Sequence, residues 1–304
     1  MTYNVERTDD DDNPWDSRNP QTAIDTIIAK NPDILGVQED GKEWYKGGFL
    51  NLQNVYLSKL TDEGYSCYST GGNGWENLNI FYKTERFTLK SSGLVFFKKL
   101  DDNPEYVALN TEGVDMDLDT LGDKETVGGV ERDKGRMFSY VVLVDKSTGI
   151  EFLVVNTHFH YGATGKDATD HNNMREYQAR ILRYWLENDE VAKQYSNLIV
   201  MGDLNTDPYN SNGWGRPAME ELTDNGGLTL VRDTALLKGD VGGTLASTSG
   251  YIRRDPDVYD HILYRNMIAV EYSVINNMVD EVDGEMRYPS DHLPVMAKFI
   301  CYAE

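Results

Sequence analysis

The sequence contains few cysteines and has no long apolar run. Two cysteines among 304 residues cannot form the disulfide framework of a small secreted domain, and they do not fix the redox compartment. No apolar stretch approaches the ~20 residues that a membrane-spanning helix needs, so we expect no stable insertion into a membrane. The N-terminus also lacks the basic segment and apolar segment that together mark a signal peptide.

The chain enters a predicted strand almost at once. Met1 is followed by Thr2-Tyr3-Asn4-Val5, a pattern typical of the end of a strand. Because a strand normally has a few residues before it, we expect that a leader was trimmed from the N-terminus. Such a leader would suit a secreted or periplasmic bacterial protein.

Positive charge is scarce. The sequence has 29 Lys and Arg against 51 Asp and Glu, which gives a formal net charge of -22. This charge argues against loose, non-specific coating of nucleic acid. It does not exclude phosphate substrates, because a bound divalent cation can reverse the local field. With no repeat period and no long linker, we expect one domain over residues 1–304 and a monomer.

Hydrophobic periodicity predicts more strands than helices. Several strands follow each other directly, which favours mixed sheets with helices outside over a pure βαβ winding. The polar, acidic stretch 101–133 is ambiguous. We predict helices over 20–30, 49–60, 172–188 and 217–224, and strands over 2–5, 34–37, 65–68, 78–82, 137–145, 151–156, 198–201, 258–264, 268–274 and 295–302.

Four apolar runs adjoin polar side chains of similar chemistry. Strand ends that project carboxylates, amides and imidazoles toward one rim build the sites of α/β sheets. Asp, Asn and Ser also occur there simply as turn formers, but four such junctions together favour a site. The junctions are Gln38-Glu39, Asn156-Thr157-His158, Gly202-Asp203-Leu204-Asn205 and Ser290-Asp291-His292.

The candidate metal ligands are oxygen donors: Asn4, Glu39, Asp203, Asn205 and Asp291. No cysteine joins them, and no pair of histidines has zinc spacing. Hard oxygen donors suit Mg²⁺, with Mn²⁺ or Ca²⁺ as alternatives. A hard cation beside two histidines fits phosphoester hydrolysis, in which the metal neutralises phosphate, a carboxylate aligns water and a histidine handles protons.

Taken in order, these motifs resemble the endonuclease/exonuclease/phosphatase superfamily over nearly the whole chain. The resemblance implies an α/β (α+β) fold in which two packed mixed β-sheets are flanked by helices, a four-layer α/β/β/α sandwich. It also implies a single metal-dependent catalytic domain. The motifs are Thr2-Tyr3-Asn4-Val5, Trp15-x-x-Arg18, Pro32-Asp33-Ile34-Leu35-Gly36-Val37-Gln38-Glu39, Asn79-Ile80-Phe81-Tyr82-Lys83, Asn156-Thr157-His158, Gly202-Asp203-Leu204-Asn205, Tyr259-Asp260-His261-Ile262 and Ser290-Asp291-His292-Leu293-Pro294.

The resemblance assigns the acidic and amide residues as follows. Glu39 is expected to be the principal metal ligand, with Asn4 and Asp291 nearby. Asp203 is expected to orient or deprotonate the attacking water. Asn205 is expected to contact phosphate or metal, and so to act in catalysis and in phosphate binding.

The resemblance also assigns roles to basic residues. His292 would stabilise the pentavalent phosphorus, with Asp260 as the carboxylate that orients it. His158 resembles the second catalytic histidine of the deoxyribonuclease and sphingomyelinase branches, and Glu76 stands where those branches have its supporting glutamate. Arg136 resembles an arginine that touches substrate phosphate.

Three further histidines have less definite roles. His160 follows His158 by two, so on a continuing strand it would share that face and line the same rim. We predict that His171 and His261 are structural or exposed.

The reaction class is better determined than the substrate. Specificity is expected in the loops 100–135 and 161–171, and the acidic stretch 101–133 has only Lys124 and Arg132 for phosphate contacts. Extended duplex DNA is therefore not the expected partner, and the first hypothesis is a small or compact phosphoester. The alternatives are a nuclease acting on DNA or RNA, and a binding module that kept the fold and lost catalysis.

Overall fold

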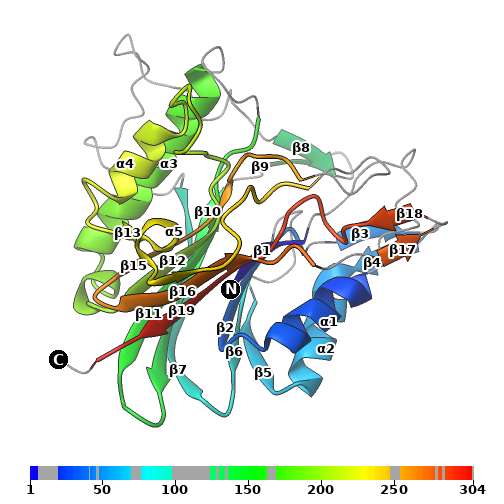
Figure 1. Cartoon of the computed structure of the whole chain (residues 1–304), viewed down its shortest axis with the longest axis horizontal. Helices are drawn as coiled ribbons and strands as arrows, with labels where there is room; N and C mark the ends of the chain where they lie inside the picture. The colour runs from blue at the N-terminus through cyan, green and yellow to red at the C-terminus, as the bar shows by residue number, and fades with distance from the viewer. Residues whose placement is uncertain are drawn as a thin grey trace.

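Two large β-sheets pack against each other, with helices on both outer sides (Figure 1). Helices α1 and α2 lie on one side of the pair, and α3 and α4 lie on the other. The structure is a computed structural model. It describes residues 1–5, 20–40, 42–45, 48–69, 77–97, 124–127, 130–133, 136–162, 169–246, 254–277, 280–282 and 285–302.

The first sheet has seven strands in the order β14-β16-β19-β1-β2-β6-β5. The pairs β1/β2 and β14/β16 are parallel and the other pairs are antiparallel, so the sheet is mixed. Its strands are β1 (Thr2–Asn4), β2 (Ile34–Gln38), β5 (Tyr65–Tyr68), β6 (Leu78–Lys83), β14 (Leu237–Lys238), β16 (Ile268–Val274) and β19 (Val295–Ile300).

The second sheet has six strands in the order β13-β15-β12-β11-β10-β7, and only β11/β12 among its pairs is parallel. Its strands are β7 (Phe87–Phe96), β10 (Met137–Asp145), β11 (Glu151–His158), β12 (Leu198–Asp203), β13 (Thr229–Leu230) and β15 (Asp260–Arg265). Three separate hairpins are β3 (Lys42–Tyr45) with β4 (Gly48–Asn51), β8 (Lys124–Val127) with β9 (Val130–Asp133), and β17 (Asp280–Val282) with β18 (Glu285–Arg287).

The helices bury their apolar stripes against these sheets. In α1, Ile24 and Ile27 belong to the same buried cluster as Leu35 and Val37 of β2. No helix of the described segments is long and apolar enough to cross a membrane. The helices are α1 (Pro20–Lys30), α2 (Leu52–Asp62), α3 (Thr169–Asn188), α4 (Arg216–Leu222), α5 (Val231–Thr234) and the 3-10 helix η4 (Ala192–Gln194).

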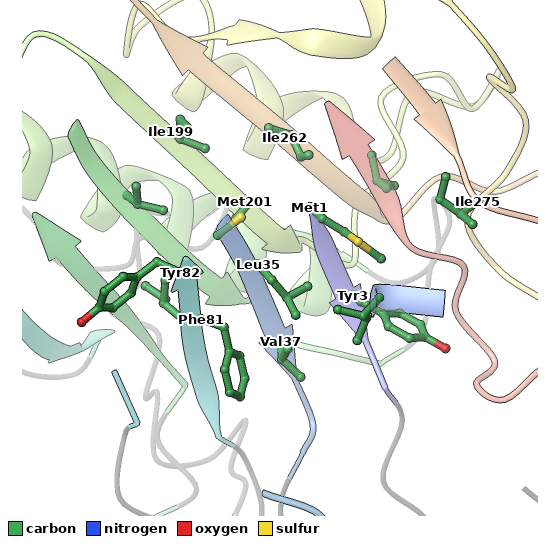
Figure 2. Close-up of a cluster of buried hydrophobic side chains, with 14 of the residues drawn as sticks. Met1, Tyr3, Leu35, Val37, Phe81, Tyr82, Ile199, Met201, Ile262 and Ile275 are labelled. Carbon is green, nitrogen blue, oxygen red and sulfur yellow. The ribbon is translucent and has the colours of Figure 1, made fainter. Parts of the chain in front are cut away.

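Side chains alternate between the outer and inner faces of each strand. In β11, Leu153 and Val155 belong to the cluster that contains the α3 core, whereas Val154 belongs to the cluster shared by both sheets. Figure 2 shows that shared cluster, with Leu35 from one sheet and Met201 from the other. The inner rows therefore form a largely apolar interface between the sheets.

The predicted layered fold, with two mixed sheets and flanking helices, is confirmed. Two predicted helix starts are wrong by three residues. Helix α3 begins at Thr169 where 172 was expected, and residues 48–51 form β4, so the helix expected from 49 begins at Leu52. Pairing with β3, in which Trp44 lies opposite Phe49, overrides the helical pattern there. Strand β7 was not predicted, because two serines and a glycine interrupt its apolar alternation.

Candidate active site

Three ionisable side chains lie in one row across the second sheet. The register of β11, β12 and β15 places His158 opposite Asp203 and Asp203 opposite Asp260. Neighbouring strands are about 4.8 Å apart, so residues in one row are close together. All three side chains are buried. The apolar rows between the sheets thus end in a row of titratable groups.

The first sheet contributes Asn4 and Glu39 to the same place. Asn4 ends β1, and its Nδ2 donates to Glu39 Oε1 at 2.9 Å and to Asp203 Oδ2 at 3.0 Å. Glu39 follows β2 with a φ of +60°, in the left-handed region that few non-glycine residues adopt. Asn4 therefore joins the two sheets at the site.

Asp203 is the residue on which the contacts converge. Its Oδ2 lies 3.3 Å from His158 Nε2 and 3.6 Å from His292 Nε2. Its Oδ1 accepts a hydrogen bond of 2.8 Å from the backbone N–H of Asn205. Burial acts to raise the pKa of Asp203, but His292, His158 and the donated hydrogen bonds more than offset it and lower that pKa. Asp203 is accordingly an ionised carboxylate at neutral pH.

His292 is held between carboxylates. Its Nδ1 lies 2.8 Å from Asp260 Oδ2, which is the predicted contact, and its Nε2 lies 3.9 Å from Asp291 Oδ1. Burial alone would lower the pKa of His292, but Asp260, Asp203 and Asp291 raise it well above its ordinary value. For Asp260, burial outweighs the opposing effect of His292 and raises the pKa. Of His292, Asp260 and Asp203, His292 is therefore the group that holds the proton.

The loop that carries His292 is tied to the start of the chain. Ser290 Oγ donates to the backbone carbonyl of Asn4 at 2.8 Å and accepts from the His292 N–H at 3.0 Å. An isolated bridge pairs Leu245 with His292. Both ends of the described chain thus meet at the site.

Asn205 and two carboxylates surround the ring of His158. Asn205 Nδ2 lies 3.2 Å from the Phe159 carbonyl, which only accepts, so this nitrogen is a donor. The same Nδ2 lies 3.0 Å from His158 Nε2. His158 Nε2 also lies 3.3 Å from Asp203 Oδ2, and Nδ1 lies 3.8 Å from Glu39 Oε1, so the ring stands between two carboxylates.

The donor set fits a hard divalent cation. Ligand atoms of Glu39, His158 and Asp203 lie within 4.8 Å of one another, as do those of Asp203, Asp260 and His292. The Glu39 side chain is 27% exposed, so its carboxylate opens toward solvent beside the amide of Asn4. Carboxylate and amide oxygens are the ligands that Mg²⁺, Mn²⁺ and Ca²⁺ accept.

Most of the predicted site residues come together, and their roles remain predictions. Asp291 lies beside His292, with a side chain 31% exposed. Arg136 precedes β10, and its guanidinium lies 5.4 Å from the centroid of the exposed Tyr161 ring. Glu76 lies outside the described residues, so its predicted pairing with His158 is a prediction still.

Sequence reasoning missed the supports behind the segment after His158. Buried Arg175 donates to the His160 carbonyl at 3.1 Å, and Gln178 Oε1 accepts from the His160 N–H at 2.7 Å. Both residues come from α3. The signal in the sequence was a cation, Arg175, and an amide, Gln178, three residues apart on an otherwise apolar helix face.

His160 and His171 form a stacked pair. Their Nε2 and Nδ1 atoms are 2.9 Å apart. Burial, followed by the charges of Arg136, His171, Arg175 and His158, lowers the pKa of His160 to about 3, so His160 is neutral. His261 is buried, and its Nε2 contacts the Thr206 carbonyl at 2.8 Å, which agrees with a structural role.

Replacement of Gly202 by Ala is expected to destabilise the protein by about 3 kcal/mol or more. Gly202 has a φ of +153°, and a Cβ there would lie 1.8 Å from the Thr157 carbonyl oxygen of the paired strand. Thermal unfolding measures the effect. The control is Gly149→Asn, at a φ of +73° with nothing within 4 Å, which Asn tolerates. Equal melting temperatures for the two variants would contradict the steric argument.

Comparisons with known proteins agree with this geometry. The model of the endonuclease/exonuclease/phosphatase family matches residues 1–292. No curated protein sequence matches the chain significantly.

Solved structures share the fold at low identity. An endonuclease/exonuclease/phosphatase family protein of Bacteroides thetaiotaomicron is 19% identical with a TM-score of 0.70, covering 99% of this chain and 97% of its own. A mannosyl-6-phosphatase of the same species is 20% identical with a TM-score of 0.68, covering 98% of each chain. D. rerio TDP2 in complex with a single-strand DNA product is 15% identical with a TM-score of 0.59, covering 98% of this chain and 97% of its own. The match over residues 1–292 shows that the chain belongs to the endonuclease/exonuclease/phosphatase family.

Proposed function

We propose that the protein is a divalent-metal-dependent hydrolase of a small or compact phosphoester. The observation that carries the proposal is the convergence on Asp203. One carboxylate oxygen lies within 3.6 Å of Asn4, His158 and His292, which come from both sheets. An ionised carboxylate next to a protonated histidine is a pair of groups that can take and give protons during hydrolysis.

Glu39, Asn4 and Asp291 would hold the cation, with Mg²⁺ as the first expectation and Mn²⁺ or Ca²⁺ as alternatives. When bound, such an ion supplies positive charge that draws electron density from the phosphate. Glu39 offers the exposed carboxylate, and Asn4 fixes its orientation through the 2.9 Å hydrogen bond. The same amide holds Asp203, so the residues of both sheets are oriented together.

The protein's own residues divide the hydrolysis between them. Asp203 orients the attacking water and accepts its proton as the new P–O bond forms. Protonated His292 donates a hydrogen bond to the phosphoryl group while the ester P–O bond breaks, and the leaving oxygen takes up a proton from solvent water. Asp260 keeps the Nδ1 proton of His292 in place at 2.8 Å, which leaves Nε2 directed toward Asp203. Asn205 and His158 would contact the phosphate.

The charge of the protein supports a compact substrate. A net charge of -22 repels a polyanion over roughly one Debye length of 8 Å at physiological salt. Arg136 and Arg175 are both close enough to His160 to lower its pKa, but Arg175 is buried and donates to the His160 carbonyl. Few cations are thus offered to a long phosphate backbone, and one phosphate with its immediate substituents suits the site better. The mannosyl-6-phosphatase with the same fold acts, as its name states, on a small phosphoester.

We expect small phosphoesters to be hydrolysed in preference to duplex DNA. The measurement compares the kcat/KM of mannose 6-phosphate, a nitrophenyl phosphomonoester and a nitrophenyl phosphodiester with plasmid nicking, each with Mg²⁺, Mn²⁺ or Ca²⁺ at low salt. Plasmid titrated into the small-ester assay should compete weakly. The matched control is the same panel in excess chelator.

The alternatives give different results in that panel. Plasmid or single strands cleaved at an efficiency well above every small ester would establish the nuclease alternative instead. A chain inactive on every substrate, yet still able to bind a phosphoester, would indicate the binding module. Against the binding module stands the assembled set of Asp203, Asp260 and His292.

A further inference from the structure

Behind the site, two buried amides join the sheets. Gln38 Nε2 of β2 donates to Asn156 Oδ1 of β11 at 2.6 Å, and both side chains are fully buried. We call Gln38 and Asn156 the amide bridge. Because β2 and β11 belong to different sheets, this hydrogen bond crosses the apolar interface.

The amide bridge is fixed in orientation by its other partners. Asn156 Nδ2 donates to the carbonyls of Val37 at 2.9 Å and Asn79 at 3.0 Å, which lie opposite each other in the β2/β6 pairing. Gln38 Nε2 also contacts Thr2 Oγ1 at 3.0 Å. Carbonyls only accept, so the Asn156 amide has one orientation. Its side chain thus bonds entirely within the opposite sheet.

A glycine in β2 leaves room for the Asn156 side chain to approach the first sheet. Gly36 lies on the inner face of β2, where a Cβ would be 2.8 Å from Asn156 Oδ1 and 2.9 Å from Met201 Cε. Only a residue without a side chain leaves Asn156 in its present place. The glycine therefore belongs to the same arrangement as the amide bridge.

The amide bridge lies next to the site in sequence on both sheets. Gln38 directly precedes Glu39, and Asn156 stands two residues before His158 on the same face of β11. The site itself is divided between the sheets, with Asn4 and Glu39 on one side and Asp203 with His158 on the other. A sliding or spreading of the sheets would separate these two groups.

Buried polar groups strongly favour one arrangement of the two sheets. A buried amide left without its partner costs about 1–3 kcal/mol, so the sheets cannot shift past each other without losing hydrogen bonds. Apolar contacts alone are not directional. The amide bridge can therefore fix the spacing of the sheets more narrowly than the surrounding aliphatic side chains.

We propose that Gln38 and Asn156 are positioning residues that set the distance between the two groups of site residues. This inference rests on the proposed function for the importance of that distance, and neither residue contacts the substrate. The expected consequence is that loss of the amide bridge weakens metal binding and slows turnover beyond what the loss of stability explains.

The test uses Gln38→Met, Asn156→Ala and the double variant of the full chain. Mn²⁺ affinity is measured by titration calorimetry without substrate, alongside kcat, KM and the melting temperature. We expect each single variant to bind Mn²⁺ about tenfold more weakly or worse, and the double variant to lose little more, because the pair acts as a unit. Gln38→Met keeps the side chain's length and so guards against simple misfolding.

Val154→Ala is the matched control. Val154 is buried on the same inner row of β11, two residues before Asn156, and contributes packing to the cluster shared by both sheets. It should lower the melting temperature and leave the Kd for Mn²⁺ within about twofold. Equal weakening of Mn²⁺ binding in Val154→Ala and Asn156→Ala at equal loss of stability would overturn the proposal.

A crystal structure of Asn156→Ala separates this proposal from the proposed function. Loss of the Asn4 Nδ2–Asp203 Oδ2 contact, 3.0 Å in the wild type, supports the positioning role whether or not metal binds. Retention of that contact overturns it. A wild-type protein that neither binds Mn²⁺ nor hydrolyses any ester would refute the proposed function, and the crystal structure would still decide on the amide bridge.

Discussion

Replacement of Asp203 by Asn is expected to lower kcat about a thousandfold or more, and His292→Gln should do the same. The physical reason is that each group depends on the other. The histidines hold Asp203 ionised, and the carboxylates hold His292 protonated. Replacing either Asp203 or His292 removes a group that keeps the other in its charged form. The double variant should therefore lose little beyond the larger single loss. Steady-state kinetics on the best small ester measures all three variants.

The matched control for this pair is His261→Gln. His261 is buried next to Asp260 on β15, but its Nε2 contacts a backbone carbonyl outside the convergence on Asp203. It should cost some stability and leave kcat close to that of the wild type. Losses that multiply fully in the double variant would show that Asp203 and His292 serve separate steps. Folding of each variant is checked by circular dichroism and thermal unfolding.

Replacement of Glu39 by Gln is expected to weaken metal binding at least tenfold and to lower turnover about a hundredfold or more. Gln keeps the size of the side chain and can still accept the hydrogen bond from Asn4, so the fold should persist. What disappears is the negative charge at the exposed edge of the site. Raising the metal concentration should restore part of the activity, and chelator should abolish wild-type activity until Mg²⁺ or Mn²⁺ is returned.

Glu151→Gln provides the control for charge removal elsewhere. Glu151 pairs with Lys90 at 2.8 Å, and the side chains are 37% and 48% exposed. An exposed pair of this kind contributes little to stability, and it lies outside the site. Metal titration should find wild-type affinity in Glu151→Gln. Full wild-type activity in excess chelator, or unchanged affinity in Glu39→Gln, would be incompatible with a catalytic metal at Glu39.

The sequence predicted the layered fold and the junctions that carry the site, because both follow from local patterns. An apolar run that stops at a polar tip is visible without knowledge of neighbours, as at Met201-Gly202-Asp203. The contact between His292 and Asp260 was predicted through the family resemblance, and the two atoms lie 2.8 Å apart.

Other features depend on which strands become neighbours, and no local pattern contains that information. The row of His158, Asp203 and Asp260 exists only because β12 lies between β11 and β15 in exact register. The hydrogen bonds from α3 to His160 likewise join distant segments. Helix α2 starts only at Leu52 because the residues before it pair with β3. This pairing overrides the helical pattern of the sequence there.

The hydrogen bond from Ser290 to Asn4 has a consequence for biosynthesis. These residues are 286 positions apart, so the link between them can form only after nearly the whole described chain has been made. Contacts of such long sequence separation form late, because closing a long loop costs entropy first. A nascent or truncated polypeptide that stops before Ser290 has no His292 and cannot close the site. The proposed hydrolytic activity is therefore expected only in a chain that contains both Asn4 and the segment from Ser290 to His292.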